Sequence, residues 1–356
     1  YALFMVLKGE HEGKRWDEWP KEIRARKASA LKAVRKTHAQ KILFVKFLQY
    51  AFSCQWKKLK ARCSQLGIAL IGDMPIYVNE DSADVWAHPE FFKLDEHLRP
   101  EFVAGVPPDY FSETGQRWGN PVYDWDRLKK DGYGWWVSRL RRQFEIFDIV
   151  RIDHFRGFET YWEIPSREET AVNGHWADGP KDEFFKMMKK QFPEFPIIGE
   201  DLGIITEEVT ALMERFEIPG MKVLQFAFSG DQETHPYLPK NYKDNCIVYT
   251  GTHDNNTTRG WFCHDASDED RRNLAAYLGK TPDEHDIAWD LIAVALNSRA
   301  VLAVIPLQDL LNLGKDARMN IPGTAHDNWR WRFSGTVPDE AVSRVKALTQ
   351  QTSRLA

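Results

Sequence analysis

Cysteine is scarce in this sequence. The chain has 356 residues but only four cysteines, Cys54, Cys63, Cys246 and Cys263, and no two of them have C-x-x-C spacing. Scattered cysteines predict reduced thiols and argue against a disulfide framework or a cysteine-rich zinc site. We therefore expect a cytoplasmic protein.

The sequence also lacks an excess of one charge and any long hydrophobic run. Its net charge is -4 and its pI is near 6.3, so it offers no basic surface for nucleic acid. No apolar run reaches the roughly 18 residues that a membrane span needs. The opening stretch, Y-A-L-F-M-V-L-K, has no features of a signal peptide. We expect neither a nucleic-acid nor a membrane partner.

Several motifs of common enzyme classes are missing. There is no G-x-G-x-x-G or P-loop, which disfavours a nucleotide-binding sheet, and no G-x-S-x-G of the serine hydrolases. A metal-dependent barrel hydrolase is a weaker alternative, because Asp-His and His-Asp pairs can bind metals. The paired histidines of H-x-H or H-E-x-x-H are absent from the sequence, so we expect no metal and no cofactor.

Short apolar runs recur along the chain between amphipathic, helix-like segments. We count six such runs, near residues 69, 149, 198, 224, 248 and 303. Alternation of this kind is typical of parallel β/α units. A polar side chain follows each run, in chain order Asp73, Asp153, Glu200, Gln225, Asp254 and Gln308. Such residues at strand ends are typical of a barrel whose active site lies at one rim.

We therefore predict the α/β class with a (β/α)8 TIM barrel that carries helical and loop insertions. The first two strands are expected to lie before Tyr1, where an apolar segment is already under way. Residues 1–66 are predicted to form a helical region and residues 67–356 the barrel. Residues 74–133, rich in Pro, Gly and aromatics, are predicted to form a long lid loop.

Three acidic residues, Asp153, Glu200 and Asp254, each follow a predicted strand. Each could be a simple ion pair or helix cap, but three on one rim favour glycosyl transfer. Retaining enzymes use one carboxylate as nucleophile and a second as acid and base, roughly 5–5.5 Å apart. Arg151, two residues before Asp153 on a strand, faces the same side and can keep that carboxylate ionised. His253 is either a donor to a sugar hydroxyl or a structural residue.

Aromatic residues in polar loops also fit a sugar ligand. The chain has 14 tryptophans, and one of them lies in G-Q-R-W-G-N. A tryptophan in such a loop can stack on the apolar face of a sugar ring.

Four motifs in order are similar to those of the 4-α-glucanotransferases, also called amylomaltases or disproportionating enzymes, which are relatives of the α-amylase superfamily. These motifs are G-D-M-P-I-Y-V, V-R-I-D-H-F-R-G, G-E-D-L-G and T-G-T-H-D-N-N-T. The resemblance runs from Tyr1 nearly to the C-terminus. It implies transfer of α-1,4-glucan segments between maltodextrin, starch or glycogen chains. Family members also carry an N-terminal part that is expected to precede Tyr1.

The resemblance implies roles for individual residues. Asp153 matches the nucleophile, Glu200 the acid/base and Asp254 the third carboxylate, which binds hydroxyls of the distorted sugar. The implied substrate-binding residues are Arg151, His253, Asp73, Asp109, Tyr110, Gln116, Trp118 and Asn320. Two other functions stay open: a retaining α-1,4-glucan hydrolase, which shares the same intermediate, and a non-catalytic α-glucan-binding fragment.

Overall fold

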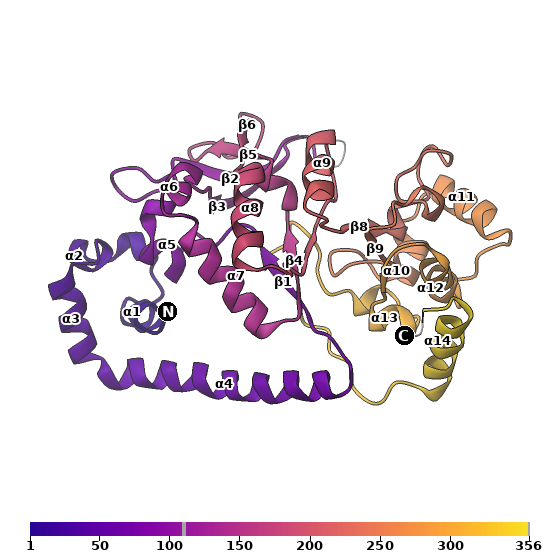
Figure 1. The fold of residues 1–356 in the computed structure, drawn as a ribbon, viewed down its shortest axis with the longest axis horizontal. Helices are drawn as coiled ribbons and strands as arrows, with labels where there is room; N and C mark the ends of the chain where they lie inside the picture. The colour runs from indigo at the N-terminus through magenta and orange to yellow at the C-terminus, as the bar shows by residue number, and fades with distance from the viewer. Residues whose placement is uncertain (109–111, 355–356) are drawn as a thin grey trace. The chain divides into compact units, whose positions relative to one another are not determined.

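The computed structural model describes residues 1–108 and 112–354, which form two compact units, Tyr1–Ile218 and Pro219–Ala356 (Figure 1). Each unit is described by itself. The predicted division at residue 66, between a helical region and a barrel, was based on sequence texture and stays a prediction. Two predicted substrate contacts, Asp109 and Tyr110, lie outside the described residues.

Six strands of the described residues pair in parallel, at the six predicted places. In the first unit the sheet order is β1-β4-β7, and in the second it is β10-β9-β8. Their bounds are β1 Ile71–Pro75, β4 Ile149–Asp153, β7 Ile197–Gly199, β8 Gly220–Val223, β9 Cys246–Tyr249 and β10 Leu302–Val304. The apolar runs therefore predicted the presence and the order of these strands, although not all of their bounds.

The structure corrects two strand boundaries. The strand expected near residue 69 begins only at Ile71, so Asp73 lies inside β1 rather than after it. Burial alternates along β1, with Gly72 and Met74 buried and Asp73 on the other face, where it pairs with Arg151 of β4. The strand expected near residue 224 ends before it, at Val223, and a 3₁₀ turn, Leu224–Phe226, follows it.

The helix that begins after Thr206 ends at Arg215, and Gly220 opens β8. Glu217 adopts the left-handed conformation with φ 58°, which lets the Ile218 N–H bond to the Met213 carbonyl at 2.9 Å. This pattern closes a helix end in the way that glycine usually does.

Residues 74–133 hold regular elements, whereas the sequence predicted a long loop. They include α5 (Ala83–Ala87), α6 (Trp125–Lys130) and two strands of a four-stranded antiparallel sheet of order β3-β2-β5-β6. Its strands are β2 Phe102–Val106, β3 Gln116–Pro121, β5 Thr160–Pro165 and β6 His175–Asp178. These strands are short, and β3 contains Gly, Asn and Pro, so they carry little periodic signal.

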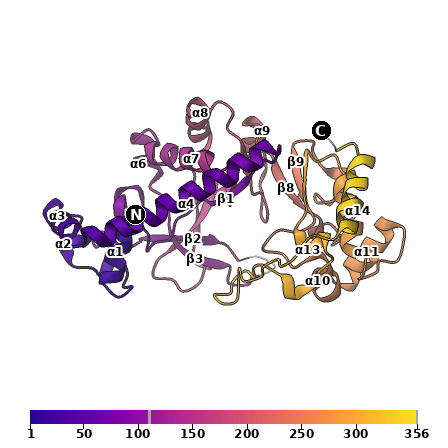
Figure 2. The ribbon, with the colours of Figure 1, turned by 90° about the horizontal axis from the view of Figure 1, so that it is seen from below.

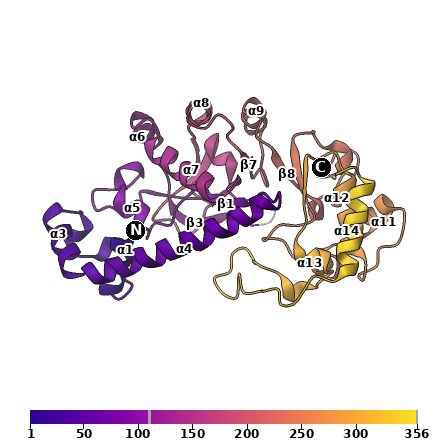
Figure 3. The same cartoon turned by 60° about the horizontal axis from the view of Figure 1, so that its bottom comes forward.

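The first unit has its core between the parallel sheet and the helices α7 and α8. Rings from both helices meet Phe158: the Phe158 and Phe184 rings lie 4.7 Å apart and the Phe158 and Trp136 rings 5.4 Å apart. Figure 2 and Figure 3 show α1, α2 and α3 gathered near the N-terminal end of the long α4. The helix bounds are α1 Ala2–Glu10, α2 Lys21–Arg24, α3 Ala28–Thr37, α4 Ala39–Gln65, α7 Gly134–Ile146, α8 Lys181–Gln191 and α9 Glu207–Arg215.

The core of the second unit forms around α12 (Ile287–Asn297). One side of α12, with Ile287 and Leu291, packs with Val248 of β9, and the other side, with Ile292, packs with Val345 of α14. The remaining helices are α10 Thr258–Gly260, α11 Asp268–Leu278, α13 Leu307–Leu310 and α14 Asp339–Gln351. Within the described ranges of the whole chain, no helix is long and apolar enough to cross a membrane.

Candidate active site

The first group of functional side chains lies on the neighbouring strands β1 and β4. Parallel pairing sets Asp73 beside Arg151. The nearly buried Arg151 guanidinium donates from Nη1 to the Asp73 carboxylate at 2.7 and 2.8 Å, and its Nη2 lies 3.0 Å from Oδ1 of Asp153. One arginine thus holds both carboxylates. This is the contact between Arg151 and Asp153 that the sequence predicted.

Glu200 follows β7, the next strand of the same sheet. Its Oε1 accepts from the Leu202 N–H and its Oε2 from the His154 N–H, both at 2.7 Å. Burial and, as a smaller effect, the negative charge of Asp153 raise the pKa of Glu200 to about 7. The two N–H donors and Arg151 oppose this rise without cancelling it. Glu200 can therefore be either protonated or ionised near neutral pH. A residue that acts first as an acid and then as a base needs both forms.

His154 connects the two carboxyl-bearing strand ends, a role that the sequence did not reveal. Its backbone is left-handed, with φ 52°, and this conformation turns its N–H toward Glu200. The main chain adds two bonds, from Phe155 N–H to the Glu200 carbonyl at 3.1 Å and from Glu200 N–H to the Ile152 carbonyl at 3.0 Å. The ends of β4 and β7 are thus fixed to each other.

The His154 ring is buried and neutral. Burial lowers its pKa to about 3, and the positive charge of Arg156 acts in the same direction. Its Nε2 has no hydrogen-bond partner among the described residues. The ring lies edge-on to Trp118, with centroids 4.8 Å apart. Arg156 points elsewhere: it donates to the Ile204 carbonyl and lies 4.1 Å over the Trp176 ring, which fits a supporting role.

Trp118 and Gln116, two predicted substrate contacts, lie on β3. The Trp118 indole N–H donates to Oε1 of Gln116 at 3.1 Å, and the side chain of Trp118 is 38% exposed. An exposed tryptophan whose N–H is already satisfied leaves its ring face for an apolar ligand surface. The structure thus places Trp118 in contact with His154, the residue that follows Asp153.

The second unit carries Asp254, His253 and Asn320. Oδ1 of Asp254 accepts from the Asn320 amide at 2.6 Å, and Nε2 of His253 lies 3.3 Å from Oδ2 of Asp254. Two residues that the sequence did not indicate complete this group. Arg318 donates to the Asp254 carbonyl at 2.8 Å, and the Trp329 ring lies 5.1 Å from the His253 ring.

A buried acid anchors the loop that carries His253 and Asp254. The Asp309 carboxylate accepts from the Thr250 hydroxyl at 2.5 Å and from the Thr258 N–H and hydroxyl at 2.8 Å. Burial raises the pKa of Asp309. These bonds fix the loop at both ends. Gln225 and Gln308, which the sequence placed at strand ends, donate to the carbonyls of Asn256 and Ala317, so both are structural.

The structure gives the local geometry of each group within its own unit: Asp73, Arg151, Asp153 and Glu200 in the first, and His253, Asp254 and Asn320 in the second. That all three carboxylates share one rim stays a prediction. Nowhere in residues 1–108 and 112–354 do three or more His, Cys, Asp or Glu side chains form a group that could hold a metal ion. The structure shows no disulfide among the residues that it describes.

A family model described as 4-alpha-glucanotransferase matches residues 1–337. The chain belongs to this family. A 4-alpha-glucanotransferase of Thermus thermophilus is 50% identical, over all of this chain and 72% of the relative. A relative from Synechocystis with the same name is 52% identical, over 94% of this chain and 66% of its own length. The family consists of transferases of the glycoside-hydrolase type, so the predicted enzyme class is confirmed.

Solved structures confirm the predicted fold class. An amylomaltase from Streptococcus agalactiae, solved with acarbose, superimposes with a TM-score of 0.95 at 37% identity, over 99% of this chain and 71% of that one. An amylomaltase from Corynebacterium glutamicum gives a TM-score of 0.72 at 18% identity, which supports the fold alone. The fold is that of the TIM-barrel enzymes related to α-amylase.

Proposed function

We propose that the protein transfers α-1,4-glucan segments to the 4-hydroxyl of glucose or of another maltodextrin, with retention of configuration. The observation that carries the proposal is the contrast between two neighbouring carboxyl groups. Asp153 has an arginine at 3.0 Å, whereas Glu200 has its pKa raised by burial to about 7. Two carboxyls with such different surroundings suit the roles of nucleophile and acid/base.

In the first step Glu200 donates its proton to the glycosidic oxygen while Asp153 attacks the anomeric carbon. The C–O bond to the leaving glucan breaks, and a covalent glucosyl ester forms on Asp153. Arg151 keeps Asp153 anionic before the attack. The leaving chain departs with the proton of Glu200, which is then a carboxylate.

In the second step Glu200 takes the proton of an incoming 4-hydroxyl, whose oxygen displaces Asp153 from the anomeric carbon. Two inversions restore the α configuration. We assign Asp254 and His253 to the sugar hydroxyls, where bonds that strengthen in the transition state lower the barrier. Asn320 holds Oδ1 of Asp254, so it orients that carboxylate. Asp73 shares Arg151 and thereby supports the nucleophile.

The donor and acceptor are α-1,4-glucans such as maltodextrin, starch or glycogen, and no cofactor takes part in this scheme. Gln116 and Trp118, with Asp109 and Tyr110, are the proposed acceptor contacts. We also propose a cytoplasmic location, which the small number and the scattered positions of the cysteines support; two plant relatives, from potato and Arabidopsis, are named chloroplastic/amyloplastic enzymes.

Incubation with maltotriose tests the proposal. Transfer gives a ladder of longer maltodextrins together with glucose. A retaining hydrolase has the same intermediate, but it passes the glucan to water and gives only maltose and glucose. A non-catalytic glucan-binding protein leaves maltotriose unchanged. Either of these two outcomes would contradict the transferase assignment.

A further inference from the structure

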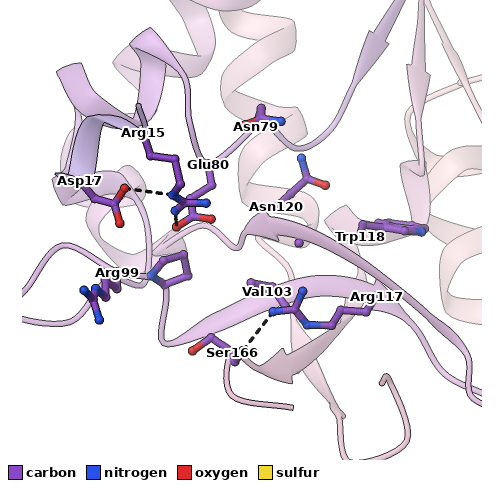
Figure 4. Close-up of a pocket in the computed structure, with 12 residues that line it drawn as sticks. Arg15, Asp17, Asn79, Glu80, Arg99, Val103, Arg117, Trp118, Asn120 and Ser166 are labelled. Carbon is purple, nitrogen blue, oxygen red and sulfur yellow. Dashed lines mark hydrogen bonds and ion pairs between the residues drawn. The ribbon is translucent and has the colours of Figure 1, made fainter. Parts of the chain in front are cut away.

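A polar pocket of about 480 Å³ lies beside Trp118 in the first unit (Figure 4). One wall is formed by Arg117, Trp118 and Asn120 of β3, and the opposite wall by Arg15, Asn79 and Glu80. Pockets that hold small molecules have volumes of roughly 300–1,000 Å³, so this one is large enough for sugar rings. Of the residues named in its walls, only Trp118 has a role in the mechanism above.

The polar side chains of this pocket are fixed, yet they keep groups for a ligand. Arg15 pairs with Glu80 and, at 3.0 Å, with Asp17. Asn120 donates its amide to the Val78 carbonyl at 2.9 Å and so leaves its oxygen as an acceptor. Asn79 uses its oxygen on the Asp81 N–H at 2.8 Å and so leaves its amide as a donor.

Arg117 lies on the same wall. Its Nη2 donates to the Ser166 carbonyl at 3.0 Å, as Figure 4 shows, and among the described residues its other N–H groups remain available to a ligand. The pocket thus offers donors and acceptors side by side.

This mixture fits a polyhydroxylated, uncharged ligand. A sugar hydroxyl both donates and accepts, so it can use the Asn79 amide and the Asn120 oxygen together. Glu80 and Asp17 pair with Arg15, so these three charges largely compensate one another on that wall. The exposed Trp118 supplies the apolar surface on which a sugar ring can lie.

Trp118 also links the pocket to the proposed reaction site. It lines the pocket, and its ring meets the His154 ring at 4.8 Å. His154 directly follows Asp153, the proposed nucleophile, and its N–H binds the proposed acid/base. A glucan bound at Asp153 that passes Trp118 therefore reaches the pocket.

We infer that this pocket is a further α-glucan subsite, which binds the rings of long glucans that extend beyond Trp118. The inference rests on the proposed function and adds a chain-length preference to it. Short glucans that end before Trp118 make no use of the pocket. Loss of a pocket side chain should therefore weaken the reaction of long substrates alone.

The test compares transfer from maltotriose and from maltoheptaose in Arg117→Ala and Asn79→Ala variants of the protein that carries this chain. Each variant loses hydrogen bonds worth about 1.4 kcal/mol, so kcat/KM for maltoheptaose should fall about tenfold. The value for maltotriose should stay unchanged. Arg142→Ala is the matched control, because Arg142 is an exposed arginine of α7 that pairs with Glu145 outside the pocket.

Equal losses for both substrates, or no loss for maltoheptaose, would overturn the inference. Calorimetry of maltoheptaose binding tests the proposed subsite independently of the proposed transfer activity. If the wild type binds maltoheptaose and Arg117→Ala binds it about tenfold more weakly, the subsite stands even where no transfer is seen. Binding that disappears in high salt, or that inorganic phosphate displaces, would identify an anion site instead and contradict the inference. Thermal unfolding of both variants checks that they fold.

Discussion

The Glu200→Gln variant should gain stability relative to the wild type as the pH rises from acidic to alkaline values. Burial raises the pKa of Glu200 from its ordinary 4.5 to about 7. Each pKa unit corresponds to about 1.4 kcal/mol, so ionising this carboxyl in the folded protein costs about 3 kcal/mol more than in the unfolded chain. Glutamine has the same shape and carries no charge, so the variant avoids this cost.

The sign and the pH window follow from the direction of the shift. The native state binds the Glu200 proton more tightly than the unfolded chain, so its stabilising effect is complete below pH 4.5. The wild type loses that stability as the pH rises through about 7. The Glu200→Gln variant has no ionisable carboxyl at this position, so it does not lose stability in this way. The difference in unfolding free energy should therefore grow by about 3 kcal/mol in favour of the variant between pH 4.5 and pH 8.

A second effect of the substitution does not depend on pH. Both oxygens of Glu200 accept backbone N–H groups, from Leu202 and His154. The amide group of glutamine has one oxygen and one nitrogen, and the nitrogen cannot accept a hydrogen bond. The variant therefore loses one of the two bonds, which lowers its unfolding free energy by about 1–3 kcal/mol at every pH. The pH-dependent part of the difference, and not its absolute value, is the quantity that tests the reasoning.

Urea unfolding at a series of pH values from 4.5 to 8 measures this difference. Glu194→Gln, an exposed glutamate in the loop before β7, is the control and should change stability by less than about 0.5 kcal/mol throughout. A Glu200→Gln difference that stays constant with pH would refute the argument that burial holds the proton on Glu200.

Three further substitutions test the other proposed roles. Asp153→Asn should lower kcat by several powers of ten while circular dichroism and thermal unfolding show an intact fold; an active variant would remove Asp153 from the nucleophile role. Arg151→Lys should lower kcat at least about tenfold, because a lysine cannot hold the carboxylates of Asp73 and Asp153 as the guanidinium does, and steady-state kinetics near wild-type values would contradict this. Asn320→Ala should lower kcat/KM about tenfold to a hundredfold by freeing Asp254, with the loss read from maltotriose transfer; an unchanged value would show that Asp254 needs no such support.

The parallel strands could be predicted because their sequence signal is local. Buried runs such as residues 246–249 and 197–199 are apolar on both faces, which is typical of strands covered on both sides. The carboxylates could be found for the same reason, since Asp153 ends such a strand, Glu200 directly follows one and Asp254 lies five residues after one. Arg151 could be paired with Asp153 because residues two apart on a strand face the same way.

Other features could not be predicted because they depend on partners far away in the chain. Strand β2 pairs with β5, about 60 residues later, and neither has a clear alternating pattern. The bond from His154 to Glu200 requires a left-handed residue that is not glycine, and no local rule assigns that conformation to histidine. Arg318 and Asp309 act on the Asp254 loop from more than 50 residues away.

Mass spectrometry of a trapped intermediate tests the central claim most directly. Glu200→Gln lacks the base of the second step, so incubation with a maltosyl donor that has a fluoride leaving group should accumulate a covalent glycosyl-enzyme. Proteolysis should then place the added sugar on the peptide that contains Asp153. A sugar on a different carboxylate, or no adduct while the wild type turns over the same donor, would contradict the account.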